Sequence, residues 1–320
     1  MKNFVTLQKT KHHAEILSNR VKKNYNHLRR RFARNKIDCF RLYDWDIPEV
    51  RAVVDWYKGR LVIAEYVRQQ TSEDWLPQMA EAVARVLDVP EDNVFIKHRR
   101  TSVGEEPRYS KLASNGNRFI VNEWDLQFWV NVEDFLDTGL YGDHRETRVL
   151  VRKFVKGKDF LNLFAYTGAF TCAVAAAGAK SSVTVDRSET YLKWAQDNLN
   201  LNEFSGKQHV FIQSDIFQFL NNAERSGNRF DIVFVDPPSF FQDKDAGKKF
   251  DVNKDHPMLL KKVLRVVVPG GHVFFSTNHQ RFEPRLKDLP VTFIKEITPQ
   301  TIPEDYRNKK IHRCWRMTSI

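Results

Sequence analysis

The strongest constraint on the fold of this chain is the alternation, after Asp143, of short apolar runs with helical segments. Each run is too short for a helix, so it predicts a buried strand. We predict strands at residues 160–163, 182–185, 210–213, 232–235, 272–276, 291–295 and 312–317, with helices between the first six. This alternation predicts a parallel sheet with helices on both faces and ligands at the carboxyl ends of its strands. The last two runs leave no room for a crossover helix, so we expect an antiparallel edge.

The first 36 residues are strongly basic. They contain eleven Lys and Arg and one acid, Glu15, so they hold nearly all of the chain's net charge of +11. Apolar residues recur among these charges at helical spacing, which predicts a helix with a narrow apolar seam. We interpret this helix as an arm that binds RNA phosphates; the alternative is a solvated helix that only packs on the body. The candidate RNA-binding residues are Lys22, Lys23, Arg29, Arg30, Arg31 and Arg34 on the arm, and Arg99 and Arg100 beyond it.

Between the arm and the alternating region, strand-like runs surround one amphipathic helix at residues 73–87. This mixture predicts a small α+β domain, which we expect to face RNA beside the arm. The 320 residues are enough for two domains of about 150 residues each. We therefore divide the chain into a basic helical arm (1–36), the small domain (37–135) and an α/β domain (136–320).

Cysteine usage and hydropathy exclude several classes of protein. Cys39, Cys172 and Cys314 lie far apart with no paired spacing, so neither a disulfide framework nor a zinc site is indicated. The start of the chain has no apolar signal-peptide core, and no run of about eighteen apolar residues occurs. We expect a cytoplasmic protein that binds no metal and no membrane. The sequence carries no indication of the oligomeric state.

The stretch FDIVFVDPPSF, residues 230–240, delivers polar and aromatic groups at the end of an apolar strand. Pro237 and Pro238 fix the backbone and have no N–H group, so the Asp236 carboxylate and the loop carbonyls become rigid acceptors. Phe240 adds a face on which an unstacked base can lie. We interpret these four residues as the site that holds a substrate base. The alternative is an ordinary strand followed by a Pro-Pro turn.

The turn after the first predicted strand of the α/β domain contains a single glycine, Gly168. A dinucleotide fold uses several glycines there to approach a pyrophosphate, so NAD is disfavoured. An adenosine cofactor without phosphates needs one tight turn, a carboxylate for the ribose after the second strand and a polar group near adenine after the third. Asp186 and Asp215 stand at these places, although either acid could instead cap a helix. The pattern fits S-adenosylmethionine and predicts a class I, Rossmann-like methyltransferase domain.

Three residues at the start of the α/β domain complete the predicted cofactor site. Asp143, His144 and Arg145 are placed to contact the methionine end of the cofactor, where Arg145 offers a forked donor to the carboxylate. The alternative is that Asp143 caps the helix that follows.

Five stretches of the sequence resemble one enzyme family in order and spacing. They are LDTGLYGDHRETR, KDFLNLFAYTGAFT, VTVDRSETYLKWAQDNLNLN, FDIVFVDPPSF and IHRCW. The family is that of the bifunctional 23S ribosomal RNA guanine methyltransferases, and the resemblance is to the C-terminal half, which makes 7-methylguanosine. The resemblance covers essentially the whole chain, including the basic arm.

The resemblance implies S-adenosylmethionine as methyl donor and a guanine of large-subunit ribosomal RNA as target. It also implies that the N2-guanine methyltransferase activity of the other half is absent here and belongs to a separate partner. Carried onto this chain, the cofactor-binding residues are Asp143, His144, Arg145, Phe164, Tyr166, Thr167, Gly168, Asp186, Arg187, Asp215 and Asp236.

Other reactions remain open alternatives. A cytosine-C5 RNA methyltransferase needs a cysteine thiolate, expected near the end of the fifth strand, where this chain has Ser276, Thr277 and Asn278. Amine methylation at N2 of guanine or N6 of adenine also uses an acidic or amide residue before Pro-Pro. A non-catalytic RNA-binding assembly factor is the alternative from a different class.

Overall fold

The computed structural model describes residues 2–67, 72–100, 115–242 and 249–320. The chain forms two compact units. Unit 1 contains residues 1–142 and 304–308, and unit 2 contains residues 143–303 and 309–320. Within the described residues, no helix is long and apolar enough to cross a membrane.

Unit 1 is built on a four-stranded sheet with the order β1-β2-β3-β4, in which only the β3–β4 pair is parallel. Its elements are α1 (Lys2–Arg34), β1 (Cys39–Asp44), β2 (Ala52–Tyr57), β3 (Arg60–Val67), α2 (Trp75–Leu87), β4 (Val94–Arg100) and the hairpin of β5 (Phe119–Glu123) and β6 (Leu126–Val130). The predicted helix at residues 73–87 is confirmed as α2.

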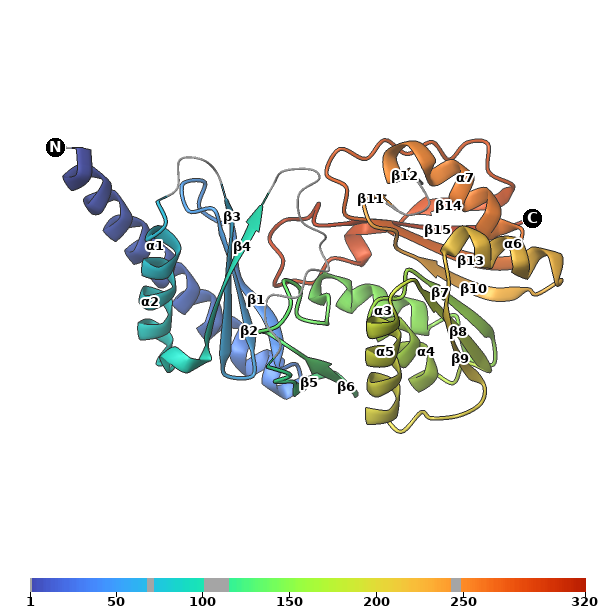
Figure 1. Ribbon diagram of the computed structural model, residues 1–320, viewed down its shortest axis with the longest axis horizontal. Helices are drawn as coiled ribbons and strands as arrows, with labels where there is room; N and C mark the ends of the chain where they lie inside the picture. Colours follow the sequence, from blue (N-terminus) through green and yellow to red (C-terminus); the bar gives the residue numbers. More distant parts are fainter. Residues whose placement is uncertain (1, 68–71, 101–114, 243–248) are drawn as a thin grey trace. The chain divides into compact units, whose positions relative to one another are not determined.

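The long helix α1 confirms the predicted basic helix. Leu17, Val21, Leu28 and Phe32 recur at helical spacing and are buried in one core with residues of α2 and the sheet. The helices α1 and α2 lie side by side (Figure 1). The apolar seam of α1 therefore packs on its own unit, and the basic residues are left on the outer side.

Unit 2 contains a seven-stranded sheet with the order β14-β15-β13-β10-β7-β8-β9. Its elements are α3 (Arg145–Arg152), β7 (Asp159–Leu163), α4 (Ala169–Ala176), β8 (Ser181–Asp186), α5 (Glu189–Leu201), β9 (His209–Gln213), α6 (Ile216–Arg225), β10 (Phe230–Val235), β11 (Phe240–Gln242), β12 (Lys249–Asp251), α7 (Val252–Leu264), β13 (Val267–Thr277), β14 (Val291–Glu296) and β15 (Arg313–Ser319). The predicted strands are confirmed, as is the antiparallel edge, because β15 runs antiparallel to both β13 and β14.

Helices cover both faces of this sheet (Figure 1). Along the central strand β10, Val233 and Val235 lie in a core with α6 and α7. The alternate residues Ile232 and Phe234 lie in a second core with α3 and α4. Because side chains alternate across a strand, this all-apolar run buries both faces, and the result is the predicted three-layer α/β domain.

The helix predicted between the fifth and sixth strands is wrong, because residues 278–290 form no helix. Two prolines interrupt the segment, and a proline removes a helical hydrogen bond. Side chains of α7 bind its backbone instead. The Glu283 N–H donates to Asn253 Oδ1 at 2.8 Å. The Arg285 N–H donates to His256 Nε2 at 2.9 Å.

Candidate active site

The predicted site residues of unit 2 follow four neighbouring parallel strands. The strands β9, β8, β7 and β10 are adjacent in the sheet. Strand β7 leads into residues 164–168, and β8 ends at Asp186. Asp215 follows β9, and Asp236 follows β10. Carboxyl ends of parallel strands meet at one edge, so the topology brings these groups to the same side of the sheet.

The turn after β7 has an unusual backbone. Phe164 and Tyr166 both adopt the left-handed region, with φ of 56° and 51°. Non-glycine residues rarely do so, and such strain persists only where the surroundings hold it. The Tyr166 N–H donates to Asp186 Oδ2 at 2.9 Å, and Asn198 Nδ2 donates to the carbonyl of the buried Thr167, also at 2.9 Å. The turn is therefore fixed from β8 and from α5.

Gly168 begins α4 and allows two helices to pack closely. Its φ is 71°, and a Cβ placed on it would lie 2.6 Å from the Cβ of Ala195 in α5. Both the backbone conformation and the short distance require glycine. The structure thus gives Gly168 a packing role in addition to its place in the predicted cofactor turn.

Replacing Gly168 by alanine should therefore destabilise unit 2 more than the same change at Gly227. Gly227 has nearly the same φ, 72°, but nothing lies within 4 Å of its added Cβ. We expect Gly227→Ala to lower the free energy of unfolding by about 1–2 kcal/mol through the left-handed backbone alone. Gly168→Ala should lose a further ~1–3 kcal/mol through overpacking against Ala195. Urea unfolding measures the free energy of unfolding of both variants. Equal losses in the two variants would show that the contact with Ala195 contributes nothing.

Asp186 ends β8 and is not a helix cap. Ser188 caps α5 instead, and its hydroxyl accepts from the Tyr191 N–H. Asp186 Oδ1 accepts from the Ser188 N–H at 2.9 Å. Burial raises the pKa of the Asp186 carboxyl, although backbone N–H donors of Ser188, Tyr166 and Arg187 lower it. Each carboxylate oxygen has two lone pairs, so this carboxylate retains acceptor capacity for ribose hydroxyls.

Asp215 does cap a helix. It is the N-cap of α6, and its Oδ1 accepts from the Gln218 N–H at 3.1 Å. Asp215 therefore serves as a helix cap, and its contact with adenine stays a prediction.

Aromatic side chains gather beside these turns. Arg187 is exposed, and its guanidinium lies 5.5 Å from the ring centroid of Phe241 in β11. Phe241 stacks on Phe250 of β12 at 5.2 Å, and Phe164 lies 6.4 Å from Phe250. The sequence reasoning missed Phe241 and Phe250, because only the pairing of β11 with β12 brings them together.

The residues predicted to hold a base follow β10. The side chain of Asp236 is 27% exposed. Pro237 is buried and Pro238 is half-buried, whereas Phe240 is 45% exposed. The loop therefore presents one partly exposed carboxylate and one exposed aromatic face.

A hydrogen bond joins this loop to the end of β13. The Ser239 hydroxyl donates to Asn278 Oδ1 at 2.7 Å. The Val252 N–H donates to the Ser239 carbonyl at 3.0 Å. The sequence reasoning gave neither Ser239 nor Asn278 a role, and the contact spans 39 positions of the chain.

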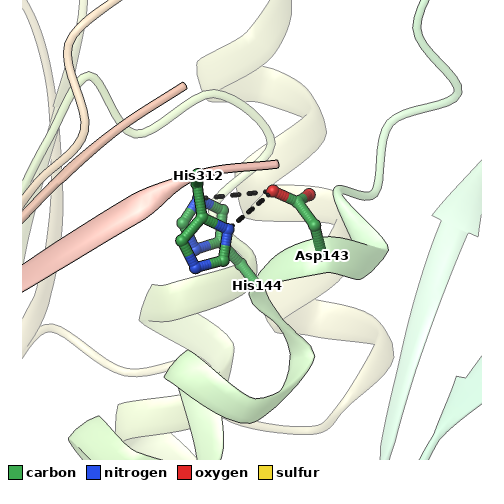
Figure 2. A group of neighbouring side chains, drawn as sticks. All are labelled: Asp143, His144 and His312. Atoms are coloured by element: carbon green, nitrogen blue, oxygen red, sulfur yellow. Dashed lines mark hydrogen bonds and ion pairs between the residues drawn. The ribbon is translucent and has the colours of Figure 1, made fainter. Parts of the chain in front are cut away.

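Figure 2 shows a group of one acid and two histidines, Asp143, His144 and His312. His144 Nε2 lies 3.3 Å from Asp236 Oδ2 and 3.9 Å from Asp143 Oδ2. His312 Nδ1 lies 2.9 Å from the same oxygen of Asp143. The two histidine rings stack at 4.2 Å with an interplanar angle of 14°. His312 was missed as a site residue, although the stretch IHRCW contains it.

Among the described residues, Asp143, His144 and His312 form a set whose ligand atoms lie within 4.8 Å of one another. An imidazole binds a metal ion in the plane of its ring, and the planes of these two rings are nearly parallel. A single ion cannot lie in both planes, so the geometry suits hydrogen bonding and does not suit a metal centre.

The remaining predicted cofactor residue, Arg145, is buried in the first turn of α3. The N-cap of α3 is His144, so the alternative in which Asp143 caps that helix is wrong. Asp143 instead accepts from His312.

The predicted RNA-binding residues of α1 lie on the surface of unit 1. Lys22, Lys23, Arg29, Arg30, Arg31 and Arg34 are all exposed. Arg31 forms an ion pair with Glu304, and Arg29 lies 5.4 Å from the ring centroid of Tyr25. The side chains of Arg99 and Arg100 lie outside the described part of the chain.

Comparison with known proteins shows the family of the chain. A family model described as S-adenosylmethionine-dependent methyltransferase matches residues 45–294. Ribosomal RNA large subunit methyltransferase K of Neisseria meningitidis serogroup B is 40% identical, over 98% of this chain and 90% of that protein. Ribosomal RNA large subunit methyltransferase K/L of Aliivibrio salmonicida is 43% identical over 94% of this chain. This chain spans 43% of the length of that K/L protein.

The fold also has solved relatives. The crystal structure of a candidate methyltransferase complexed with SAH covers 97% of this chain and 81% of its own, with a TM-score of 0.75 and 20% sequence identity. At that identity the likeness establishes the fold.

Proposed function

The chain belongs to the S-adenosylmethionine-dependent methyltransferase family, and from this premise we propose that it methylates N7 of a guanine in large-subunit ribosomal RNA. The chain covers 90% of the Neisseria meningitidis relative, and the name of that protein supports large-subunit ribosomal RNA as the substrate. The resemblance to the half that makes 7-methylguanosine supports the position of the methyl group. The observation that carries the proposal is the partly exposed Asp236 carboxylate, held by His144 at the end of β10.

The residues at the carboxyl edge fit the cofactor. Asp186 offers a carboxylate to ribose hydroxyls, and the fixed left-handed turn at Phe164 and Tyr166 offers a shaped backbone beside it. Asp215 lies after the next strand, β9, and we assign it to adenine. Asp143 to Arg145 lie on the side of Asp236. S-adenosylmethionine, when bound, supplies an electrophilic methyl group on a sulfonium.

The chain's own task is to position the base. Guanine N7 carries a lone pair and no proton, so no general base is needed and catalysis is mainly positioning. In this proposal Asp236 accepts hydrogen bonds from guanine N1 or N2, while Pro237, Pro238 and Phe240 line the base pocket. The Ser239–Asn278 hydrogen bond ties this loop to β13 and holds it in place.

A cytosine-C5 reaction has no nucleophile here. The chain contains three cysteines, and all are buried. Burial raises the pKa of Cys172 to about 12 and also raises that of Cys314, so both stay as thiols at neutral pH. Amine methylation at N2 or N6 would use the same acid before Pro-Pro, so the identity of the methylated nucleoside separates it from the N7 reaction.

We propose that RNA phosphates bind the outer side of α1, and that residues 37–135 face the RNA beside it. The six basic side chains named above are exposed along a single helix. Two groups of exposed cations on one helix, at residues 22–23 and 29–34, suit the repeating negative charge of an RNA backbone. The partner in this proposal is large-subunit ribosomal RNA. Such a substrate places the protein in the cytoplasm.

Removing two of these charges should weaken binding in a salt-dependent way. We expect Arg29→Gln with Arg30→Gln to reduce the slope of log K against log salt by about 1–1.5, since each phosphate contact on single strands contributes about 0.7. Lys153→Gln with Lys156→Gln, two exposed lysines of unit 2, is the matched control and should change the slope less. Fluorescence anisotropy with a labelled ribosomal RNA fragment measures both. An unchanged slope in the arginine variant would contradict an RNA-binding α1.

The choice of N7 can be tested with a substrate analogue. In 7-deazaguanosine a C–H group replaces N7, while the N1 and N2 donors remain. RNA transcribed with this analogue should bind but accept no methyl group. Continued methylation would show that another atom is the acceptor.

A further inference from the structure

Asp236 is the outermost member of a buried chain of polar groups. Its Oδ2 lies 3.3 Å from Nε2 of His144, whose ring is 4% exposed. Aromatic rings hold that imidazole on several sides. His312 stacks on it at 4.2 Å, and the rings of Phe170 and Phe234 meet it at steep angles at 5.7 Å and 5.9 Å. The His144 ring therefore has little freedom to rotate unless His312 moves.

His312 is itself fixed at both ring nitrogens. It lies just before β15 and is 1% exposed. Its Nδ1–H donates to Asp143 Oδ2 at 2.9 Å, and its Nε2 lies 3.0 Å from the hydroxyl of the buried Thr301. The chain of contacts thus runs from Thr301 through His312 and Asp143 to His144 and Asp236.

The charges along this chain favour a single arrangement. Burial, the strongest influence, lowers the pKa of His144, but the carboxylates of Asp143 and Asp236 together outweigh it and raise the pKa, against a smaller opposing effect of Arg148. Burial and then the neighbouring His144 lower the pKa of His312. The raised pKa favours the charged form of His144, which lies between two carboxylates, and the lowered pKa favours the neutral form of the His312 ring stacked on it.

We propose that His312 is a positioning residue for methyl transfer: by binding Asp143 and stacking on His144, it fixes the orientation in which Asp236 holds the base. The inference rests on the proposed function of Asp236. His312 touches neither the base nor the reacting atoms, and it acts through its two neighbours.

The physical reason is competition for His144. Asp143 and Asp236 are both within reach of the same imidazole nitrogen, at 3.9 Å and 3.3 Å. The donor from His312 binds the same Asp143 oxygen that lies 3.9 Å from His144, so it fixes where that oxygen stands. Without that donor, we expect Asp143 to approach His144 more closely and to weaken the contact of His144 with Asp236.

Three substitutions of His312 separate its hydrogen bonds from its packing. An asparagine amide nitrogen replaces Nδ1 and keeps the bond to Asp143. A glutamine amide replaces only the Nε2 end, and phenylalanine keeps only the ring. We expect His312→Asn to retain kcat within about threefold, whereas His312→Gln and His312→Phe should lose about 10- to 100-fold in kcat because Asp236 is misplaced. In His312→Gln and His312→Phe, the Kd for S-adenosylhomocysteine should change by a smaller factor than kcat does, because His312 reaches the cofactor only through Asp143 and His144.

Two results would overturn the proposal. Equal losses of kcat in all three variants, in step with their thermal stability, would show a structural role only. Unchanged kcat in His312→Gln and His312→Phe would show no role. Asp236→Ala, assayed alongside, separates this failure from failure of the proposed function, because that variant loses activity only if Asp236 itself acts on the base.

A pH profile gives a readout that packing alone would not move. The raised pKa of His144 means that the imidazolium contact with Asp236 is present below that pKa and is lost as pH rises through it. Asp143→Asn keeps an acceptor for His312 but removes one of the two anions beside His144. We expect the alkaline fall of kcat to move to lower pH in this variant. The inference would be contradicted if Asp143→Asn changed the value of kcat but left the pH at which kcat falls unchanged.

Discussion

Asp236→Ala is expected to lower kcat by about 10²- to 10³-fold while the Kd for S-adenosylhomocysteine changes less than about threefold. The reason is that Asp236 is assigned to the base, where the loss of one preorganised hydrogen-bonding group costs about this much. Its carboxylate is partly exposed and is bound on its inner side by His144. Single-turnover methyl transfer and calorimetric titration measure the two quantities separately.

Asp236→Asn is the matched control for this experiment. The amide keeps the size and one acceptor oxygen but loses the charge that pairs with His144, so an intermediate loss is expected. Equal losses of kcat and cofactor affinity in Asp236→Ala would place the residue in the cofactor site and refute its assignment to the base.

Asp186→Ala is expected to have the opposite effect to Asp236→Ala, because it should weaken cofactor binding more than it lowers kcat. Hydrogen bonds to a charged group contribute about 1.5–3 kcal/mol, so losing the ribose acceptor should weaken S-adenosylhomocysteine binding by roughly 10- to 150-fold. The same change removes the acceptor of the Tyr166 N–H, which holds the strained turn after β7. Isothermal titration with S-adenosylhomocysteine measures the effect.

Glu189→Ala provides the comparison for Asp186, because Glu189 is an exposed acid in the first turn of α5. It should leave the affinity nearly unchanged, which separates a specific carboxylate from a general loss of negative charge. Unaltered binding in Asp186→Ala would remove this residue from the cofactor site.

The fold of unit 2 could be predicted because its central strands are apolar on both faces. Runs such as residues 232–235 bury alternate side chains in two separate cores, so neither face needs a polar pattern. Residues 278–290 could not be predicted in the same way. That segment is held by side chains of α7, including His256, and such tertiary contacts leave no local signal in the sequence.

The site was predictable only where its groups follow strands. Asp186 and Asp236 stand directly after β8 and β10, and the order of strands brings them to one edge. The contact of His312 with Asp143 spans 169 positions, and it depends on β15 entering the sheet beside β13. The position of Asp215 after a strand did not determine its role, because an acid at that place can also cap the following helix, as Asp215 does.

The most direct test of the central claim is to identify the methylated nucleoside. Unmodified large-subunit ribosomal RNA is incubated with the protein and labelled S-adenosylmethionine, digested, and analysed by nucleoside mass spectrometry. We expect labelled 7-methylguanosine, which disappears with Asp236→Ala. Labelled 5-methylcytidine, N2-methylguanosine or N6-methyladenosine in its place would contradict this claim.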